Sequence, residues 1–418
     1  MKPREAAYLA LLSALRHESF ISDRLAQWKD AEHPSEQDFA FAYEVASGSA
    51  RMALAIDYIG EQLSARQKLS LKLKEKALLR TAIYQHQFMD KVPLYAIVNE
   101  TIEIAKKHFH HSIASYFNAL LRRLEKANLS LPQGNSLQQL SIRYSYPQEF
   151  ITDLLKDYNK EETIEILEAG NTAPKIMLRI RPGVQINAEE LKHLSMIASE
   201  ASMCILEDRS FLSQIASSPK YYIQNATPAT LISDLASHIS PPRSILDLCA
   251  SPGGKLLAAH DLFPNAVLFA NDVSSKKLLR ISENLSKYHV EANLSCGPGE
   301  EYKGSNLFDL IILDVPCSNS GVLNKRPEAR WRLIEEALND LQKVQFNLIE
   351  RAVELLEDHG SIFYLTCSIL KCENEEVIKE ACRRYHLKAT YSRTILPNKE
   401  GWDGGFGCLL TRIRVMST

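Results

Sequence analysis

Residues 245–255, "ILDLCASPGGK", pass from apolar residues through an acid, a cysteine and a proline to a pair of glycines. The next segment, "GKLLAAHDLF", has helical spacing, so the stretch predicts a strand, a tight loop and a helix in succession. Gly253 and Gly254 carry no Cβ, so a ligand can approach this backbone closely. The stretch therefore predicts a ligand-binding loop at the end of a strand in an α/β fold.

The chain around this stretch, from about residue 236 onward, alternates between strand-like and helical segments. The strand-like segments are "SILDLCA", "AVLFAND", "FDLIILDV" and "GSIFYLTCS", and the helical ones are "GKLLAAHDLF", "SSKKLLRISENLSKYH" and "ALNDLQKVQFNLIERAVELLEDH". This alternation predicts a parallel, doubly wound sheet. Ligands of such sheets lie beyond the carboxyl ends of the strands, where we expect the loop, Asp272, Asp314 and Cys367 to meet.

The chain before residue 236 predicts two further parts. Apolar residues at three- and four-residue spacing predict a helical domain over 1–128, with Ser35 starting one helix. A Leu-Pro-Gln-Gly-Asn segment then predicts a linker. Residues 140–235 predict a small α/β module, with helices at 147–158, 160–171 and 187–198 and a strand at 175–184. Residues 236–418 form the third expected domain.

Composition sets limits on the class of protein. The formal net charge is −2, and the eight cysteines form no Cys-x-x-Cys pair, so we expect reduced thiols and no metal site. No apolar run spans a bilayer and the first residues lack a signal-peptide core, so we expect a cytoplasmic protein without membrane contact. The oligomeric state is left open by the sequence, and a monomer is the expectation. Residues 66–80 hold six basic residues and one acid, which fits either a nucleic-acid patch or a solvated helix face.

The glycine loop matches neither the dinucleotide fingerprint nor the nucleoside triphosphate loop. Asp272 ends the next predicted strand, where an acid commonly binds ribose hydroxyls. A loop and an acid without a phosphate fingerprint suit an adenosyl ligand that lacks phosphate, such as S-adenosylmethionine. The alternative is a structural turn beside a surface aspartate.

Two later cysteines, in "DVPCS" (314–318) and "LTCS" (365–368), indicate covalent chemistry. Cytosine C5 accepts a methyl group once a thiolate has added to C6, which splits one difficult step into easier ones. An acid near N3 and the exocyclic amine stabilises the charge that develops. Cys317, Cys367 and Asp314 are the candidates for these roles.

The stretches "LDLCASPGGK", "FDLIILDVPCSNSGVL…RPEARW" and "YLTCSILKCENE" resemble RNA cytosine-C5 methyltransferases of the RsmB/NOL1/NOP2/Sun family. The resemblance implies a Rossmann-like, S-adenosylmethionine-dependent domain in which Cys367 is the nucleophile, Cys317 helps to release the methylated RNA and Asp314 lies beside cofactor and base. It implies these cofactor-binding residues: Cys249, Ala250, Ser251, Pro252, Gly253, Gly254, Lys255, Asp272 and Asp314.

The match has gaps. Pro298 stands where the family has an acid for the adenine amine, so Glu300 either replaces it or the contact is lost. Asp403, in "GWDGGFGCLL", is a weak site candidate, and Arg181 either contacts RNA phosphate or faces water. The N-terminal stretches "REAAYLALLSAL", "FAYEVASGSAR" and "FNALLRRL" resemble a NusB-like helical domain, which implies a ribosomal RNA partner, 16S rRNA or an assembling small subunit. The alternatives are a non-catalytic RNA-binding assembly factor and a DNA cytosine methyltransferase.

Overall fold

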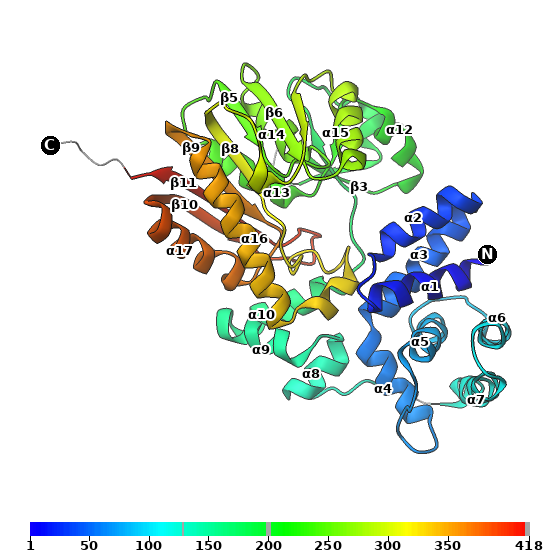
Figure 1. The fold of residues 1–418 in the computed structure, drawn as a ribbon. Helices are drawn as coiled ribbons and strands as arrows, with labels where there is room; N and C mark the ends of the chain where they lie inside the picture. The colour runs from blue at the N-terminus through cyan, green and yellow to red at the C-terminus, as the bar shows by residue number, and fades with distance from the viewer. Residues whose placement is uncertain (128, 198–201, 414–418) are drawn as a thin grey trace. The chain divides into compact units, whose positions relative to one another are not determined.

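The computed structural model describes residues 1–127, 129–197 and 202–413, which form two compact units (Figure 1). The helical unit comprises Met1–Asn171 and Leu323–Leu333, and the sheet unit comprises Thr172–Val322 and Ile334–Thr418. Residue 128 and residues 414–418, which the expected domain bounds include, lie outside the described residues, as do 198–201.

The helical unit is built of ten α-helices and two short 3-10 helices in its described part. They are α1 (Pro3–Leu15), α2 (Ile21–Glu32), α3 (Glu36–Arg51), α4 (Ala53–Leu63), α5 (Leu73–Gln87), α6 (Leu94–His108), α7 (His111–Leu121), η1 (Leu124–Lys126), α8 (Leu137–Tyr144), α9 (Gln148–Asp157), α10 (Lys160–Ala169) and η4 (Pro327–Arg332). Ser35 caps α3 as the sequence predicts, because its side chain accepts a hydrogen bond from the Asp38 amide.

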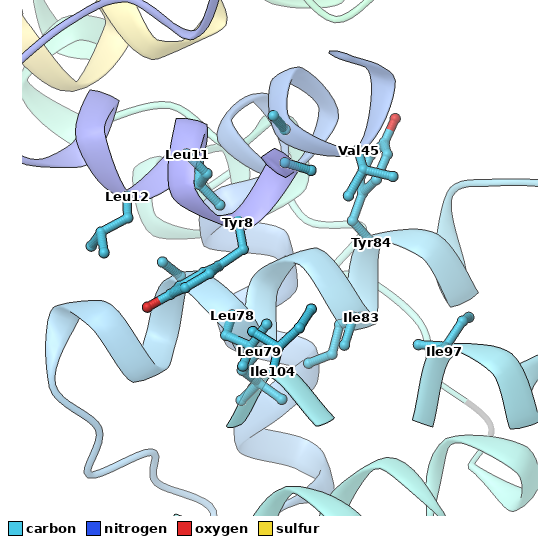
Figure 2. Close-up of a cluster of buried hydrophobic side chains, with 14 of the residues drawn as sticks. Tyr8, Leu11, Leu12, Val45, Leu78, Leu79, Ile83, Tyr84, Ile97 and Ile104 are labelled. Atoms are coloured by element: carbon cyan, nitrogen blue, oxygen red, sulfur yellow. The ribbon is translucent and has the colours of Figure 1, made fainter. Parts of the chain in front are cut away.

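The core of this unit lies where α1, α3, α5, α6 and α7 meet. Tyr8 and Leu11 from α1, Leu79 and Ile83 from α5, and Ile104 from α6 belong to one buried cluster (Figure 2). The helical spacing of these apolar residues gives each helix a buried stripe, and joining the stripes stabilises the unit.

The helices α8 to α10 belong to the helical unit, whereas the strands of the expected middle module belong to the sheet unit. The three-part division expected from the sequence stays a prediction. No helix or strand lies in described residues 129–136, which include the predicted linker.

The sheet unit contains a seven-stranded sheet with the order β10-β11-β9-β8-β5-β6-β7. Its elements are β5 (Ser244–Asp247), α14 (Gly254–Leu262), β6 (Val267–Asp272), α15 (Ser275–Lys287), β7 (Asn293–Cys296), η3 (Gly299–Glu301), β8 (Phe308–Asp314), α16 (Glu335–Glu354), β9 (Leu356–Thr366), η5 (Lys371–Glu373), α17 (Glu375–Tyr385), β10 (Leu387–Ile395) and β11 (Gly405–Arg412). Strands β5 to β9 are parallel, as expected, but β11 and β10 are antiparallel to their neighbours. The parallel sheet predicted from four strand-like segments is confirmed for β5, β6, β8 and β9. The strands β10 and β11, joined by residues 396–404 without a crossover helix, add an antiparallel edge to it.

Alternate residues of the central strands face opposite sides of the sheet. Ile312 and Phe363 pack with α13 (Ala226–Ala236), α14 and α15, whereas Ile311 and Ile362 pack with α16 and α17. Helices on both faces explain why these strands are apolar throughout their length.

A second sheet of four strands, in the order β2-β3-β1-β4, completes this unit. The strands are β1 (Met177–Ile180), β2 (Leu194–Met196), β3 (Met203–Leu206) and β4 (Tyr221–Ile223), with α11 (Ala188–Leu191), η2 (Arg209–Phe211) and α12 (Leu212–Ser217) between them. The helix predicted at 187–198 is wrong beyond its first turn, because Leu194–Met196 pairs with β3 and this pairing overrides local helical spacing. Residue 198 itself lies outside the described part.

Two further expectations are corrected in the sheet unit. The helix predicted over 337–359 ends at Glu354, because Leu356 already pairs with Phe308 as the start of β9. Arg181 was expected either to contact RNA phosphate or to face water. Its guanidinium instead donates to Asp261 at 2.6 Å and to the Tyr288 carbonyl at 2.9 Å, so it is held by the protein itself. Arg179 donates to the same carboxylate. Among the described residues, no helix is long and apolar enough to cross a membrane.

Candidate active site

The parallel strands place the predicted site residues at one edge of the sheet. The loop 248–253 follows β5, Asp272 ends β6, Asp314 ends β8 and Cys367 follows β9. Because β5 is hydrogen-bonded to both β6 and β8, and β8 to β9, the carboxyl ends of these four strands are adjacent. The edge expected from the sequence is therefore formed in the structure.

Cys317 and Cys367 form a thiol pair at this edge. Their Sγ atoms lie 3.0 Å apart, and the Cys367 thiol is also 3.4 Å from the Asn319 amide oxygen. Backbone hydrogen bonds join the two loops, since the Val315 amide donates to the Leu365 carbonyl and the Gly321 amide donates to the Cys367 carbonyl. The two thiols are thus held in contact by the pairing of β8 with β9.

The two thiols differ in their surroundings. Cys317 is buried, and its hydrogen bond with Cys367 together with burial raises the pKa of the Cys317 thiol well above its usual range. Cys317 is therefore held as a neutral thiol at neutral pH, which suits a proton-transfer role better than nucleophilic attack. The Cys367 side chain is partly exposed, so a nucleobase can reach its thiol.

An ion pair lies beside the thiols. The Lys255 ammonium, from the first turn of α14, is 2.5 Å from the Asp314 carboxylate at the end of β8. Burial lowers the pKa of Lys255, but the negative charge and hydrogen bond of Asp314 outweigh burial, and the pKa is raised. A thiolate at Cys367 acts in the same direction. Lys255 therefore brings positive charge to both Asp314 and Cys367.

A buried carboxylate ties the two cysteine loops together. Glu373 is fully buried, and its Oε1 accepts a hydrogen bond from the Ser318 amide at 2.8 Å. Its Oε2 accepts from the hydroxyls of Ser318 at 2.5 Å and Ser368 at 2.6 Å. Gln345 on α16 adds a donor to Oε1 at 3.3 Å. Since Ser318 and Ser368 directly follow the two cysteines, Glu373 fixes the position of both loops.

The glycine loop is shaped for close approach. Gly253 has a φ of +99°, a conformation that glycine adopts without strain, and it is the N-cap residue that directly precedes α14. A Cβ at Gly254 would lie 2.9 Å from the Tyr222 ring, so no larger residue fits there.

Asp272 lies against this loop. Its Oδ2 accepts from the Ser251 amide at 3.2 Å, its Oδ1 accepts from the Ser274 amide at 3.3 Å, and Lys277 is 3.5 Å away. A carboxylate held beside a glycine loop fits the ribose and methionine ends of an adenosyl ligand. Of the other expected cofactor residues, Ala250 is buried, Ser251 is partly buried and Pro252 is exposed at the loop tip.

Cys249 is not brought to the thiol pair. It is half-buried and packs against the apolar cluster beneath α16. Burial and the nearby carboxylate of Asp247 raise the pKa of its thiol far above its usual range, so this thiol is unreactive at neutral pH. Its sequence position beside the glycines reflects packing at the strand end.

The turn after β7 contains Pro298 and Glu300. Pro298 precedes η3, and a Cβ on the next residue, Gly299, would lie 3.1 Å from the Leu248 carbonyl, so this turn packs against the glycine loop. Glu300 is exposed, and its charge is among those that raise the pKa of Cys249. Glu300 is therefore the acid that this turn offers to the loop.

Asp403 lies before β11, buried, with its amide donating to Asn225 at 3.0 Å. The next residue, Gly404, donates to the Gly321 carbonyl at 2.7 Å in the loop after Cys317. This segment supports the cysteine loop through its backbone, and a direct role for the Asp403 side chain stays a prediction.

Three residues at this edge were missed from the sequence. Asp247 ends β5 beneath the loop, and burial together with the Asp314 charge raises its pKa to about 8. Glu373 and Asn319 hold the thiol loops. An acid six residues after Cys367 in "CSILKCE" is the only sequence signal for Glu373. Among the residues that the structure describes, no group of three or more His, Cys, Asp or Glu side chains could hold a metal ion.

Two family models match the chain. Residues 237–410 match the model for the 16S rRNA methyltransferase RsmB/F, and residues 1–126 match the NusB family. The first match contains every expected catalytic and cofactor-binding residue, and the second covers most of the N-terminal helices.

Curated relatives are similar over almost the whole chain. The "Ribosomal RNA small subunit methyltransferase B" of Vibrio cholerae is 27% identical over 99% of this chain and 98% of its own length. The protein of the same name in Pseudomonas putida is 27% identical over 99% of both chains.

Solved structures share the fold. The crystal structure of PH0851 covers 99% of both chains with a TM-score of 0.77 at 21% identity. NSun6 from Pyrococcus horikoshii, crystallised with SFG, covers 65% of this chain and 100% of its own with a TM-score of 0.54 at 16% identity. At these identities the likeness supports the architecture alone.

Proposed function

Because residues 237–410 match the RsmB/F methyltransferase model and residues 1–126 match the NusB family, we propose that the protein methylates C5 of a cytosine in 16S ribosomal RNA. The methyl donor in this proposal is S-adenosylmethionine, and the reaction passes through a covalent bond between Cys367 and C6 of the base. The names of the curated relatives support the RNA substrate.

One observation carries the proposed chemistry. Two thiols lie 3.0 Å apart next to a Lys255–Asp314 ion pair, at the end of the sheet where the glycine loop and Asp272 also lie. A single nucleophile needs no second thiol, whereas addition to C6 followed by loss of the C5 proton needs both a nucleophile and a proton acceptor.

The steps follow from the residues. The Cys367 thiolate forms a bond to C6, and the electron pair of the C5–C6 bond becomes available at C5. Asp314, held by Lys255, stabilises the adduct through the N3 and N4 edge of the base. After C5 has gained the methyl group, the Cys317 thiol, no longer hydrogen-bonded to Cys367, gives its proton to solvent, and the resulting thiolate takes the C5 proton directly or through a water. The C5–C6 double bond then re-forms and the bond from Cys367 to C6 breaks.

The proposed cofactor contacts use the loop 249–255, Asp272 and Asp314. Asp272 binds the ribose hydroxyls, and the loop amides bind the methionine end. S-adenosylmethionine supplies an electrophilic methyl group on a sulfonium, which neutral C5 alone does not attack.

A cytosine reaches the Cys367 thiol only after it leaves its stack, so the proposed target lies in single-stranded or opened RNA. We further propose that the protein acts in the cytoplasm as a monomer, on naked rRNA or on a subunit particle.

The test is methyl transfer from labelled S-adenosylmethionine to unmethylated small-subunit rRNA, with DNA of the same sequence as the comparison. We expect label in RNA alone, and bisulfite sequencing should place it at one cytosine. Wild-type protein that methylates no RNA, or a position other than C5, contradicts the proposal. A fully active Cys367→Ala variant contradicts the nucleophile assignment.

A further inference from the structure

The helical unit carries a groove that the proposed methyl transfer does not use. The groove, of about 420 Å³, lies between the loop after α4 and helix α7. The lining residues are Ser64, Ala65, Arg66, Lys68, Ser70, Leu71, Ile113, Tyr116, Ala119, Leu120 and Arg123. They include three cations, one aromatic ring and no carboxylate.

The basic side chains of residues 66–80 fall into two groups in the structure, those that contact other residues of the helical unit and those that are exposed. Lys76 and Arg80 on α5 both pair with Asp57, at 2.8 and 2.7 Å. Lys74 lies over the Phe109 ring at 5.5 Å. These three cations serve the fold of the helical unit. Arg66 and Lys68 are exposed, and within the described part of the chain neither forms an ion pair.

The loop that carries Arg66 and Lys68 is held in place by contacts with the neighbouring helices. The Ser64 hydroxyl donates to the Lys68 carbonyl at 3.1 Å, and the Leu69 side chain packs against Gly60 of α4. Arg123, after α7, donates to the Leu63 carbonyl at 2.8 Å, which holds its guanidinium at the groove. The two basic side chains of the loop therefore project from a fixed backbone beside Arg123.

The floor of the groove is apolar and aromatic. Tyr116, Ile113 and Leu71 are partly buried and line it together with buried Leu120. A nucleotide combines an anionic phosphate with a flat base, and single strands bind where cations flank an aromatic surface. The same residues offer no acid that would repel phosphate.

We propose that this groove binds a single-stranded segment of RNA, with phosphates on Arg66, Lys68 and Arg123 and a base against Tyr116. This inference rests on the proposed function for the identity of the RNA, and it adds a second RNA contact in the helical unit. An acidic protein segment is the competing occupant, and the test separates the two.

The test uses the full chain and a fluorescent single-stranded fragment of small-subunit rRNA, with binding measured by anisotropy. The variant is Arg66→Ser/Lys68→Ser, and the matched control is Lys156→Ser/Lys160→Ser, which removes two exposed cations elsewhere in the same unit. Loss of two phosphate contacts lowers the slope of log K against log salt by about 1.4 and weakens binding about tenfold at physiological salt. The control should bind as wild type.

A second variant tests the aromatic contact. Tyr116→Leu keeps an apolar floor and removes the stacking surface, so we expect about tenfold weaker RNA binding with the salt slope unchanged. In methyl transfer, both groove variants should raise KM for RNA and leave kcat unchanged.

The outcomes distinguish this proposal from the proposed function. If the double variant binds RNA with the same Kd and salt slope as wild type, the groove proposal is wrong, whatever the methylation result. RNA binding that depends on the groove, in a protein that methylates no RNA, supports the groove and contradicts the proposed reaction. Tighter wild-type binding to a polyglutamate peptide than to RNA, lost in the double variant, assigns the groove to an acidic protein and overturns the RNA proposal.

Discussion

The thiols of Cys317 and Cys367 lie 3.0 Å apart, although 50 residues separate them in the chain. The contact gives Cys317 access to the position at which a C6 adduct on Cys367 would form. The hydrogen bond to Cys367 is the largest cause of the raised pKa of Cys317, and it would be lost once Cys367 is bonded to C6, so Cys317 could then give up its proton.

Cys317→Ala should therefore trap the intermediate. We expect the Cys367–RNA bond to form and not to break, because the proton acceptor is missing. The measurement is a denaturing gel with labelled rRNA, on which the variant should show a slow-migrating protein–RNA band that wild type lacks. Cys317→Ala/Cys367→Ala is the control and should show no band. A Cys317→Ala protein with normal turnover and no band would contradict the release role.

Glu373 should prove necessary for both loops. Glu373→Ala leaves the Ser318 and Ser368 donors unpaired in a buried site, which costs about 3 kcal/mol or more of unfolding free energy. Glu373→Gln keeps one acceptor and should cost less. Because the thiols lose their alignment, kcat should fall about 100-fold while KM for RNA stays near wild type.

The control for Glu373 is Glu376→Gln, an exposed glutamate on the neighbouring helix α17. Its unfolding free energy, measured by urea denaturation, should lie within about 0.5 kcal/mol of wild type. A Glu373→Ala protein as stable and active as this control would show that the buried network is dispensable.

The thiol loops also illustrate what the sequence can and cannot predict. The strand ends and their cysteines follow from local patterns, so the edge of the sheet that carries the site was predicted. Glu373 was not, because its partners Ser318 and Gln345 lie 55 and 28 residues away and only the folded chain brings them together.

The errors in the fold have the same origin. Leu194–Met196 has helical spacing but becomes a strand because β3 pairs with it. The antiparallel direction of β10 and β11 likewise depends on which neighbour each strand pairs with. In both cases a long-range pairing decides what local spacing leaves open.

Asp247 should make stability depend on pH. Burial, with the Asp314 charge, raises its pKa to about 8, above its unfolded value of about 4. Between these values the folded state binds more protons than the unfolded state, so the Asp247 contribution to stability falls as pH rises from about 4 to 8 and is constant above that. Asp247→Asn imitates the protonated carboxyl, so the unfolding free energy of this variant should not show this decrease between pH 4 and 8.

The measurement is the difference in unfolding free energy between wild type and Asp247→Asn from pH 5 to 9, and we expect wild type to lose on the order of a few kcal/mol relative to the variant. Asp309→Asn is the control, and its difference in unfolding free energy from wild type should stay constant over this pH range. Burial raises the pKa of Asp309, but Arg243 outweighs burial and lowers it, so its contribution is lost only as pH falls below about 4. A flat difference for Asp247→Asn over pH 5 to 9 would exclude the buried proton.

Arg330 should hold the segment Leu323–Leu333 within the helical unit. Its fully buried guanidinium donates to the carbonyls of Arg51 at 2.8 Å and Ser145 at 2.9 Å, and lies 3.9 Å from the Tyr146 ring centroid. Burial lowers its pKa to about 10, so it remains charged at neutral pH.

Arg330→Lys removes the planar donor set and the ring contact, and we expect a loss of about 3 kcal/mol in unfolding free energy. Tryptophan fluorescence during urea unfolding measures it. Arg326→Lys, an exposed position in the same segment, should change stability by less than about 0.5 kcal/mol. Equal effects of the two substitutions would show that the buried guanidinium is not what holds the segment.

Glu300 should take over the adenine contact that Pro298 lacks. Pro298 has no acidic side chain, and the turn that it begins packs on the glycine loop through Gly299. Glu300 is the acid of this turn whose charge reaches Cys249 in that loop. Glu300→Gln should weaken S-adenosylmethionine binding about tenfold in calorimetry, the cost of one charged hydrogen bond. Glu301→Gln, its exposed neighbour, should bind as wild type. If both variants bind equally well, the adenine contact is absent from this turn, and Pro298→Asp should then tighten binding.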